Sequence, residues 1–177
     1  EQLAHLSQLA RQCRENGLAF GVGLSPMGAH HDYPHKRPAL LEKVRLIEEA
    51  LKPDILAVLF DDMKGDTPDL AHWQLTIAHD IAAHTGASRL IFCPSYYSTD
   101  PVLEKVFGAM PPHYLTDLGQ GLDKRFDIFW TGPRVCSTEY PAAHLKQAAD
   151  WLHRKPFLWD NYPVNDASKA SSFLHLP

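Results

Sequence analysis

Three features are scarce in this sequence of 177 residues: cysteine, long apolar runs and clustered positive charge. The three cysteines, Cys13, Cys93 and Cys136, lie far apart without C-x-x-C spacing, which predicts reduced and mostly buried thiols rather than disulfides or a zinc site. No apolar run approaches the roughly 20 residues that a membrane span requires. No basic block occurs and the formal net charge is -4, which argues against a nucleic-acid or anionic-membrane partner.

What is present is the balance of an ordinary globular protein, with 45% hydrophobic and 21% charged residues. The length suggests one domain with a substantial core. The first residues, EQLAHLSQLARQCRENG, lack the basic and continuously apolar regions of a signal peptide and indicate a helix entered without a cap. We therefore expect residues before Glu1 to have been lost. The compartment stays undetermined, although we expect a soluble protein and favour the cytoplasm.

Apolar runs and helical periodicities alternate along the whole chain. Leu3, Leu6, Leu9 and Cys13 recur at helical spacing, and Gly17 follows as a stop. Later helices are expected over 40–51, 70–81, about 101–107 and from 141 onward. Strands are expected at 18–24, 54–60, 89–93, 126–130 and 156–159.

Local signals refine these boundaries. Thr67 suits an N-cap and Pro68 a first helical position, before the helix that begins near Leu70. The segments 25–38 and 111–125 are rich in residues that favour turns, and we expect both to be loops.

This alternation predicts an α/β fold with a parallel sheet. The strands are apolar almost throughout, as expected when both faces of a sheet are covered. A doubly wound sheet and a (β/α)8 TIM-barrel both fit, but no glycine-rich phosphate loop follows any strand. Five strands do not close a barrel of eight, so the barrel interpretation makes residues 1–177 part of a single catalytic domain. Its first strands and its last strand would then lie outside this chain.

Polar, ionisable or aromatic residues follow the expected strands directly. They are Asp61-Asp62, Ser95-Tyr96-Tyr97, Thr131, and Asp160-Asn161 with Asn165-Asp166 behind them. In parallel α/β architectures the carboxyl ends of the strands form the mouth in which sites are built. We therefore expect these residues to surround one pocket, although loops are also polar for ordinary reasons.

Asp61 and Asp62 end the most hydrophobic stretch, ILAVLFDDMK. Neighbouring side chains on a regular strand point to opposite faces, so these carboxylates do not straddle one glycosidic bond at the ~5–5.5 Å of a carboxylate nucleophile and its acid. At a frayed strand end both could reach one ligand, with one carboxyl protonated and the other ionised. This suits a general acid beside a charged orienting group. The alternative is a capping or merely solvated pair.

Other chemistries remain open at this point. His30, His31 and His35 share one loop and could join the two aspartates at a metal, but no metal-binding spacing is present, so we expect no metal and no cofactor. Trp130 and Trp159 each end an expected strand. Either indole could pack in the core or stack on the apolar face of a sugar.

Five ordered segments resemble glycoside hydrolase family 84, the O-GlcNAcases and related β-N-acetylglucosaminidases. They are GVGLSP, LAVLFDD, IFCPSYY, FWTGPRV and LWDNYPVND, which together span nearly the whole chain. The resemblance implies a (β/α)8 barrel and a retaining exo-acting reaction in which the acetamido oxygen of the substrate is the nucleophile and an oxazoline is the intermediate. Asp61 would then orient the acetamido N–H. Asp62 would protonate the leaving oxygen and later deprotonate water.

The same resemblance implies five substrate-binding residues. Tyr97 matches an active-site tyrosine near the acetamido group, and Cys93 matches a position that lines the acetyl pocket. Trp159 matches the sugar-holding aromatic residue, and Asn161 and Asp166 match residues that bind ring hydroxyls. The implied partner is a glycoprotein or glycan bearing N-acetylglucosamine, and the oligomeric state is open.

The chain also departs from the family pattern. A glycine and a lysine from the family's first strands, and an asparagine after its last segment here, have no counterpart in the 177 residues. Tyr96 and the loop HHDYPH have no clear family equivalent, and Asp160 is better explained as structural. Two alternatives follow: a barrel that binds N-acetylglucosamine without hydrolysing it, and a metal-dependent hydrolase that uses Asp61 and Asp62.

Overall fold

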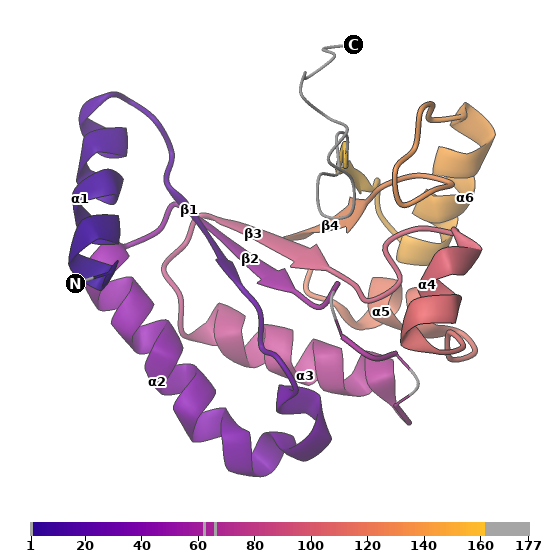
Figure 1. Cartoon of the computed structure of the whole chain (residues 1–177), viewed down its shortest axis with the longest axis horizontal. Coiled ribbons are helices and arrows are strands. Elements are labelled where there is room, and N and C mark those ends of the chain that lie inside the picture. Colours follow the sequence, from indigo (N-terminus) through magenta and orange to yellow (C-terminus); the bar gives the residue numbers. More distant parts are fainter. Residues whose placement is uncertain (1, 62, 66, 162–177) are drawn as a thin grey trace.

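A computed structural model describes residues 2–61, 63–65 and 67–161. Five parallel strands form one sheet in the order β1-β2-β3-β4-β5, so every strand lies beside its neighbour in the sequence (Figure 1). The strands are β1 (Gly21–Leu24), β2 (Ile55–Leu59), β3 (Arg89–Cys93), β4 (Phe126–Trp130) and β5 (Phe157–Leu158). The helices are α1 (Gln2–Glu15), η1 (Ala29–Asp32), α2 (Tyr33–Leu51), α3 (Leu70–Ala83), α4 (Pro101–Phe107), α5 (Tyr114–Gly121) and α6 (Ala142–Leu152).

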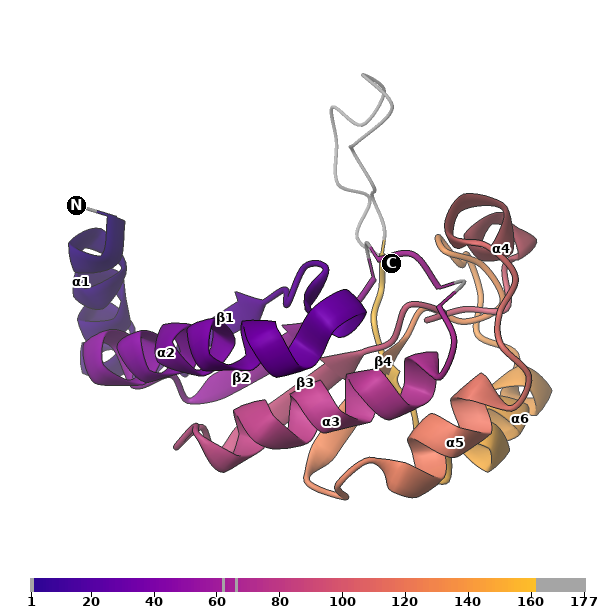
Figure 2. The same cartoon turned by 90° about the horizontal axis from the view of Figure 1, so that it is seen from below.

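The crossover helices lie on one face of the sheet. Figure 2 shows α2, α3 and α5 in a row across that face, and contacts join α2 to α3, α3 to α5 and α5 to α6. A doubly wound sheet would carry helices on both faces and reverse its strand order at a switch point. Sequential order with one helical layer is instead the arrangement of consecutive units of a (β/α)8 barrel, which confirms the barrel interpretation over the doubly wound one.

The core lies between the strands and this helical layer. In β2 and β4 alternate residues are buried, which gives Leu56 and Val58 in one strand and Phe126, Ile128 and Trp130 in the other. Their side chains pack against helical residues such as Ile77 and Leu118. Burial of a large apolar side chain contributes about 1.5–3 kcal/mol, so this layer holds the units together.

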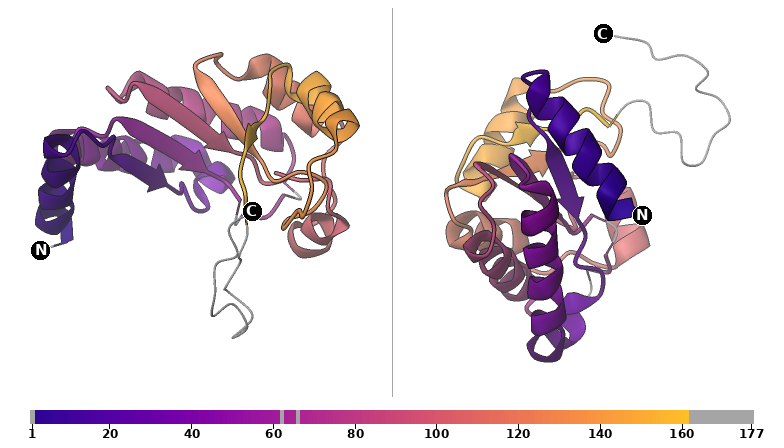
Figure 3. Two further views of the ribbon diagram at one scale, coloured as in Figure 1. Left: turned by 90° about the horizontal axis from the view of Figure 1, so that it is seen from above. Right: turned by 90° about the vertical axis from the view of Figure 1, so that its left-hand side faces the viewer.

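The second face of the sheet is only half-buried in β2 and β4, which differs from the expectation that both faces are covered, although Ile91 and Cys93 of β3 are buried there. Ile55, Ala57 and Leu59 of β2 and Phe129 of β4 alternate with the core residues and point to this face. Figure 3 shows it free of helices in the view from above. The apolar runs were therefore read correctly as two-sided strands, but no helix of the described residues covers the second side.

Several boundaries differ from the sequence predictions. Helix α3 begins at Leu70 after Asp69, whose left-handed conformation precedes the first turn, so Thr67 and Pro68 do not cap it. Helix α2 begins at Tyr33, and the expected loop 25–38 is therefore partly helical. The expected loop 111–125 contains α5, whose apolar residues Tyr114, Leu115 and Leu118 lie on one face. Glycines and neighbouring prolines hid this short periodicity.

The prediction of mostly buried thiols holds only in part, and the apolar face of α1 is exposed. The leucines Leu3, Leu6 and Leu9 of α1 are exposed, and the residue of that helix that is fully buried is Ala10. Among the cysteines, Cys93 is buried and Cys13 is partly buried, but Cys136 is exposed in the segment between β4 and α6. Helical spacing identifies an apolar face, but it does not identify what covers that face.

Candidate functional site

The parallel strands bring their carboxyl ends to one edge of the sheet. Asp61 lies two residues beyond the end of β2, in a turn, and is half-buried. It is therefore past the regular strand, which is the condition under which the two aspartates could act on one ligand. The neighbouring Asp62 and the more distant Asp166 lie outside the described residues, so the arrangement of the pair remains a prediction.

The end of β2 is held against β3. The Phe60 N–H donates to the Cys93 carbonyl at 2.9 Å, and the Ser95 hydroxyl donates to the Phe60 carbonyl at 2.8 Å. Cys93 is fully buried, so its thiol is a small apolar filler beside the residue that precedes Asp61. The structure thus pairs Cys93 with Leu59 on the adjacent strand, two residues before Asp61.

A second group forms where the loop after β3 meets β5. The rings of Tyr97 and Trp159 lie with centroids 5.2 Å apart, and Trp159 also contacts Phe129 at 5.5 Å. Asn161 donates from its side-chain amide to the Val135 carbonyl at 3.2 Å. Tyr97, Trp159 and Phe129 thus form an aromatic wall, and the Asn161 amide is tied to the segment between β4 and α6.

Trp130 and Trp159, which the sequence could not tell apart, face opposite sides of the sheet. Trp130 is fully buried in the helical layer, and its indole N–H donates to Nε2 of His144 in α6 at 3.2 Å. Trp159 is partly exposed on the opposite face, beside Tyr97. Trp130 is therefore core, and Trp159 is the more exposed of the two indoles.

Two of the polar residues at the strand ends turn inward instead of lining the mouth. Ser95 and Thr131 are both fully buried, and Thr131 donates to the Arg134 carbonyl at 2.7 Å. Asp160 is exposed beyond β5. Polarity at a strand end therefore does not by itself predict side-chain direction, since Ser95 and Thr131 point into the fold.

A buried polar cluster that was not predicted from the sequence lies behind this edge. Gln74 of α3 donates to the Ser95 hydroxyl at 2.9 Å and accepts from the Tyr114 hydroxyl. Burial raises the pKa of Tyr114, so its hydroxyl remains protonated and available as a donor. A signal was present in the sequence, since Gln74 is a single polar residue on the apolar face formed by Leu70, Ile77 and Ile81.

The loop histidines do not form a metal site with the described residues. His35 pairs with Asp32 at 2.7 Å on the surface, whereas His30 is buried in η1 with its ring 4.0 Å from that of His31. Neither ring nitrogen of His30 has a hydrogen-bond partner in the described part of the chain. Within those same residues, no group of three or more His, Cys, Asp and Glu side chains could hold a metal ion.

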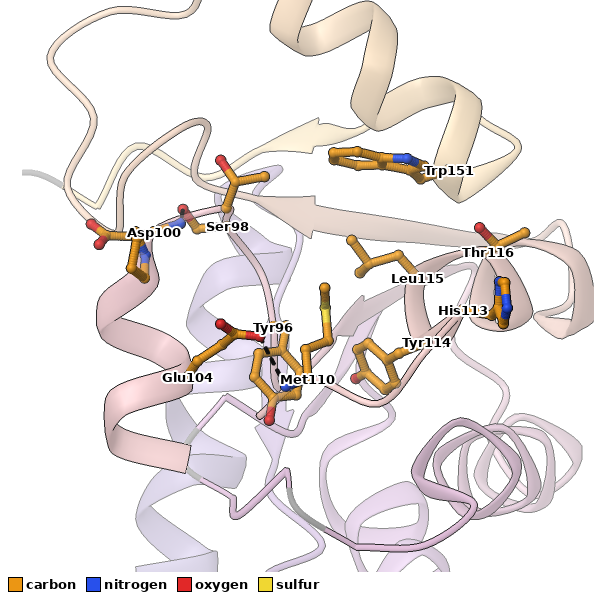
Figure 4. Close-up of a pocket in the computed structure, with 12 residues that line it drawn as sticks. Tyr96, Ser98, Asp100, Glu104, Met110, His113, Tyr114, Leu115, Thr116 and Trp151 are labelled. Atoms are coloured by element: carbon orange, nitrogen blue, oxygen red, sulfur yellow. Dashed lines mark hydrogen bonds between the residues drawn. The ribbon is translucent and has the colours of Figure 1, made fainter. Parts of the chain in front are cut away.

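A cavity of about 410 Å³ lies away from the aromatic wall, between α4, α5 and α6 (Figure 4). Trp151, Met110 and Leu115 contribute apolar surface, and Glu104 accepts a hydrogen bond from the Met110 N–H at 3.1 Å. Its base includes Tyr96 and Tyr114. None of the described residues that the resemblance assigns to the substrate lines it.

Comparison with known proteins adds to this geometry. A solved structure of an O-GlcNAc hydrolase mutant from Thermobaculum terrenum superimposes with a TM-score of 0.76 and 30% identity, covering 94% of this chain and 37% of that chain. The Protein O-GlcNAcase sequences of Rattus norvegicus and Mus musculus are each 27% identical over 184 residues. These matches cover 98% of this chain, which spans about a fifth of the length of those relatives.

No helix in the described residues is both long and apolar enough to cross a membrane. The family model for β-N-acetylglucosaminidase matches residues 1–176, which is almost the entire sequence. Together with a partial barrel that carries aspartate, tyrosine and tryptophan at its carboxyl edge, this match shows that the chain belongs to the β-N-acetylglucosaminidase family, glycoside hydrolase family 84.

Proposed function

We propose that this chain forms the middle part of the catalytic domain of a retaining exo-β-N-acetylglucosaminidase of the O-GlcNAcase type. The observation that carries the proposal is Asp61 at the carboxyl edge of the sheet, two residues after β2 and followed in sequence by Asp62, in a chain whose family model matches residues 1–176. The substrate would be a terminal β-linked N-acetylglucosamine on a glycoprotein or glycan. The names of the relatives, which refer to O-GlcNAc, support the glycoprotein.

We also propose that the first strands and the last strand of the barrel lie outside the 177 residues. The half-buried Ile55, Leu59 and Phe129 on the second face support this, because solvated large apolar side chains on a strand are unfavourable in an isolated sheet. The exposed leucines of α1 support it in the same way. Closure of the barrel would cover both surfaces and would supply the family's glycine, lysine and asparagine.

In the proposed mechanism the acetamido carbonyl oxygen attacks C1 while the C1–O bond to the leaving group breaks. Asp62 gives its proton to the departing oxygen, and Asp61 accepts a hydrogen bond from the acetamido N–H as positive charge develops on the amide. The oxazoline then opens when water attacks C1 and Asp62 takes the proton of that water. Each aspartate thus has one task, and neither needs to face the other across the sugar.

The remaining residues would hold the sugar. Trp159 would cover one face of the ring, with Tyr97 beside it at 5.2 Å between ring centroids. Asn161 and Asp166 would bind ring hydroxyls, and Cys93 would line the pocket for the acetyl methyl group. No metal is needed, because the substrate supplies the nucleophile and a carboxylic acid supplies the proton.

The test compares Asp61→Asn and Asp62→Asn in the full-length protein on two N-acetylglucosaminides, one with an alkyl and one with an activated aryl leaving group. General acid catalysis contributes about 10²–10⁴-fold, so Asp62→Asn should lose that factor on the alkyl substrate and recover largely on the aryl one. Asp61→Asn should be impaired on both. Asp69→Asn, an exposed residue of the same loop, is the control.

Equal losses for both variants on both substrates would refute this division of labour. Calorimetric binding of N-acetylglucosamine without turnover of either substrate by the wild-type protein would favour the non-catalytic barrel. Loss of activity on exhaustive chelation would favour a metal-dependent hydrolase.

A further inference from the structure

The segment that carries Asp61 is anchored by its backbone at both ends. On one side, Phe60 donates to the Cys93 carbonyl at 2.9 Å and accepts from the Ser95 hydroxyl at 2.8 Å. On the other side, the Gly65 N–H donates to the Phe107 carbonyl at 2.9 Å. The position of Asp61 therefore depends on what fixes these two anchors.

The first anchor is fixed by a closed set of buried hydrogen bonds. Ser95, Gln74 and Tyr114 are each at most 1% exposed. Gln74 donates to the Ser95 hydroxyl at 2.9 Å, the Tyr114 hydroxyl donates to the Gln74 amide oxygen, and the Ser95 N–H donates to the Tyr114 oxygen at 3.1 Å. These bonds leave the Ser95 hydroxyl one acceptor for its own proton, the carbonyl of Phe60. The set is directional, so it specifies where that carbonyl lies.

The second anchor rests on the ring of Tyr96. A Cβ atom added to Gly65 would lie 2.1 Å from the Tyr96 hydroxyl oxygen and 2.4 Å from its Cζ, so the backbone of the loop lies directly against this ring. The ring of Tyr96 is itself held in place. Its hydroxyl donates to the Gly108 carbonyl at 2.7 Å, and it packs in a T-shaped arrangement with the ring of Tyr114, with centroids 5.4 Å apart. Figure 4 shows Tyr96 and Tyr114 beside each other at the base of the cavity.

We propose that Ser95, Gln74, Tyr114 and Tyr96 are positioning residues that hold the Asp61 loop in its working place. The inference rests on the proposed function and deepens it. All four side chains are at most 1% exposed, so they act through the loop and not by touching the sugar. A misplacement of about 1 Å at a reacting group costs on the order of 10²-fold in rate, which makes rigid anchoring of this loop consequential.

The experiment uses the full-length protein with Ser95→Ala, Tyr114→Phe and the conservative variant Ser95→Thr. Ser88→Ala is the matched control. The Ser88 hydroxyl also donates to a backbone carbonyl, that of Asp54 at 3.1 Å, but this carbonyl lies at the amino end of β2, away from Asp61. Steady-state kinetics on the aryl N-acetylglucosaminide are combined with calorimetric titration by the thiazoline analogue of N-acetylglucosamine. In this probe sulfur replaces the ring oxygen of the oxazoline. Titration separates the fraction of competent sites from the affinity of each site.

We expect Ser95→Ala and Tyr114→Phe to lower kcat/KM by about 10- to 100-fold and to weaken thiazoline binding in parallel, at unchanged stoichiometry. Ser95→Thr keeps the hydroxyl and should restore most of the affinity, and Ser88→Ala should match the wild type. A merely structural role would lower the melting temperature and the stoichiometry while leaving the affinity per site intact.

A second pair of variants tests the other anchor. Gly65→Ala should impair kcat/KM strongly, and truncating the opposing ring with Tyr96→Ala in the same molecule should relieve part of that loss. If the wild type is active, either of two results would overturn this inference and leave the proposed function intact. One is that the losses caused by Gly65→Ala and Tyr96→Ala are additive. The other is that Ser95→Ala and Tyr114→Phe leave the affinity for the thiazoline unchanged. A wild-type protein that neither turns over the substrate nor binds the thiazoline would overturn the proposed function, and the inference with it.

Discussion

Arg154 joins three elements at the amino end of the barrel strands. Its guanidinium donates to the carbonyls of Asp123 at 3.0 Å, Phe126 at 2.9 Å, Gly119 at 3.1 Å and Leu122 at 2.8 Å. Gly119 and Leu122 lie at the end of α5, Asp123 lies in the loop that follows, and Phe126 begins β4. Desolvation lowers the pKa of Arg154, but a guanidinium stays protonated, so the cation also offsets the negative end of the helix.

The stability lost with Arg154 follows from these bonds. A net contribution of about 1 kcal/mol for each of the four hydrogen bonds gives about 4 kcal/mol for Arg154→Met. An ammonium reaches fewer carbonyls than the planar guanidinium fork, so Arg154→Lys should lose about 2 kcal/mol. Natural domains are stable by about 5–15 kcal/mol, so the methionine variant should fold but melt roughly 10 °C lower.

Thermal unfolding of the full-length protein, followed by circular dichroism, measures these shifts. Arg125→Met is the matched control, because Arg125 lies in the loop that Arg154 contacts and forms an exposed pair with Asp123 at 2.9 Å, a kind of interaction that contributes about 0–1 kcal/mol. Activity per folded molecule should be unchanged in all three variants, because the amino ends of barrel strands serve stability and not chemistry. A loss below about 1 kcal/mol for Arg154→Met would refute the reasoning.

Two further predictions concern close packing and pH. Gly119→Ala would place a Cβ atom 2.4 Å from the backbone carbon of Leu152, so α5 and α6 must separate at a cost of about 3 kcal/mol. Gly86→Ala, whose added atom would meet its neighbour at 3.5 Å, should be nearly neutral in the same melting assay. Burial and the nearby His31 and Lys36 lower the pKa of His30, so the unfolded state binds the proton more readily. Stability from this group should be present above about pH 6.5 and fall as the pH drops below that value. His30→Leu should flatten the pH dependence of denaturant unfolding in this window, and an unchanged slope would contradict the assignment.

The sequence was informative wherever the signal is local. The strands at 89–93 and 126–130 coincide with β3 and β4, because short apolar runs bounded by turn residues depend on few neighbours. The alternation of helices and strands sufficed for a parallel α/β fold, and five ordered segments sufficed for the family. The short helix α5 was missed because glycines and prolines interrupt its periodicity.

By itself, then, the sequence determined the class of fold, the family and the edge of the sheet at which the candidate residues gather. Only the tertiary structure decided that α2, α3, α5 and α6 form one layer on one face, that Trp130 is core while Trp159 lies on the opposite face beside Tyr97, and that Ser95 turns inward to Gln74 and Tyr114. The physical reason is that these outcomes depend on contacts between residues far apart in the chain. Side-chain direction at a strand end is set by the partner it meets across the fold, and no local pattern specifies that partner.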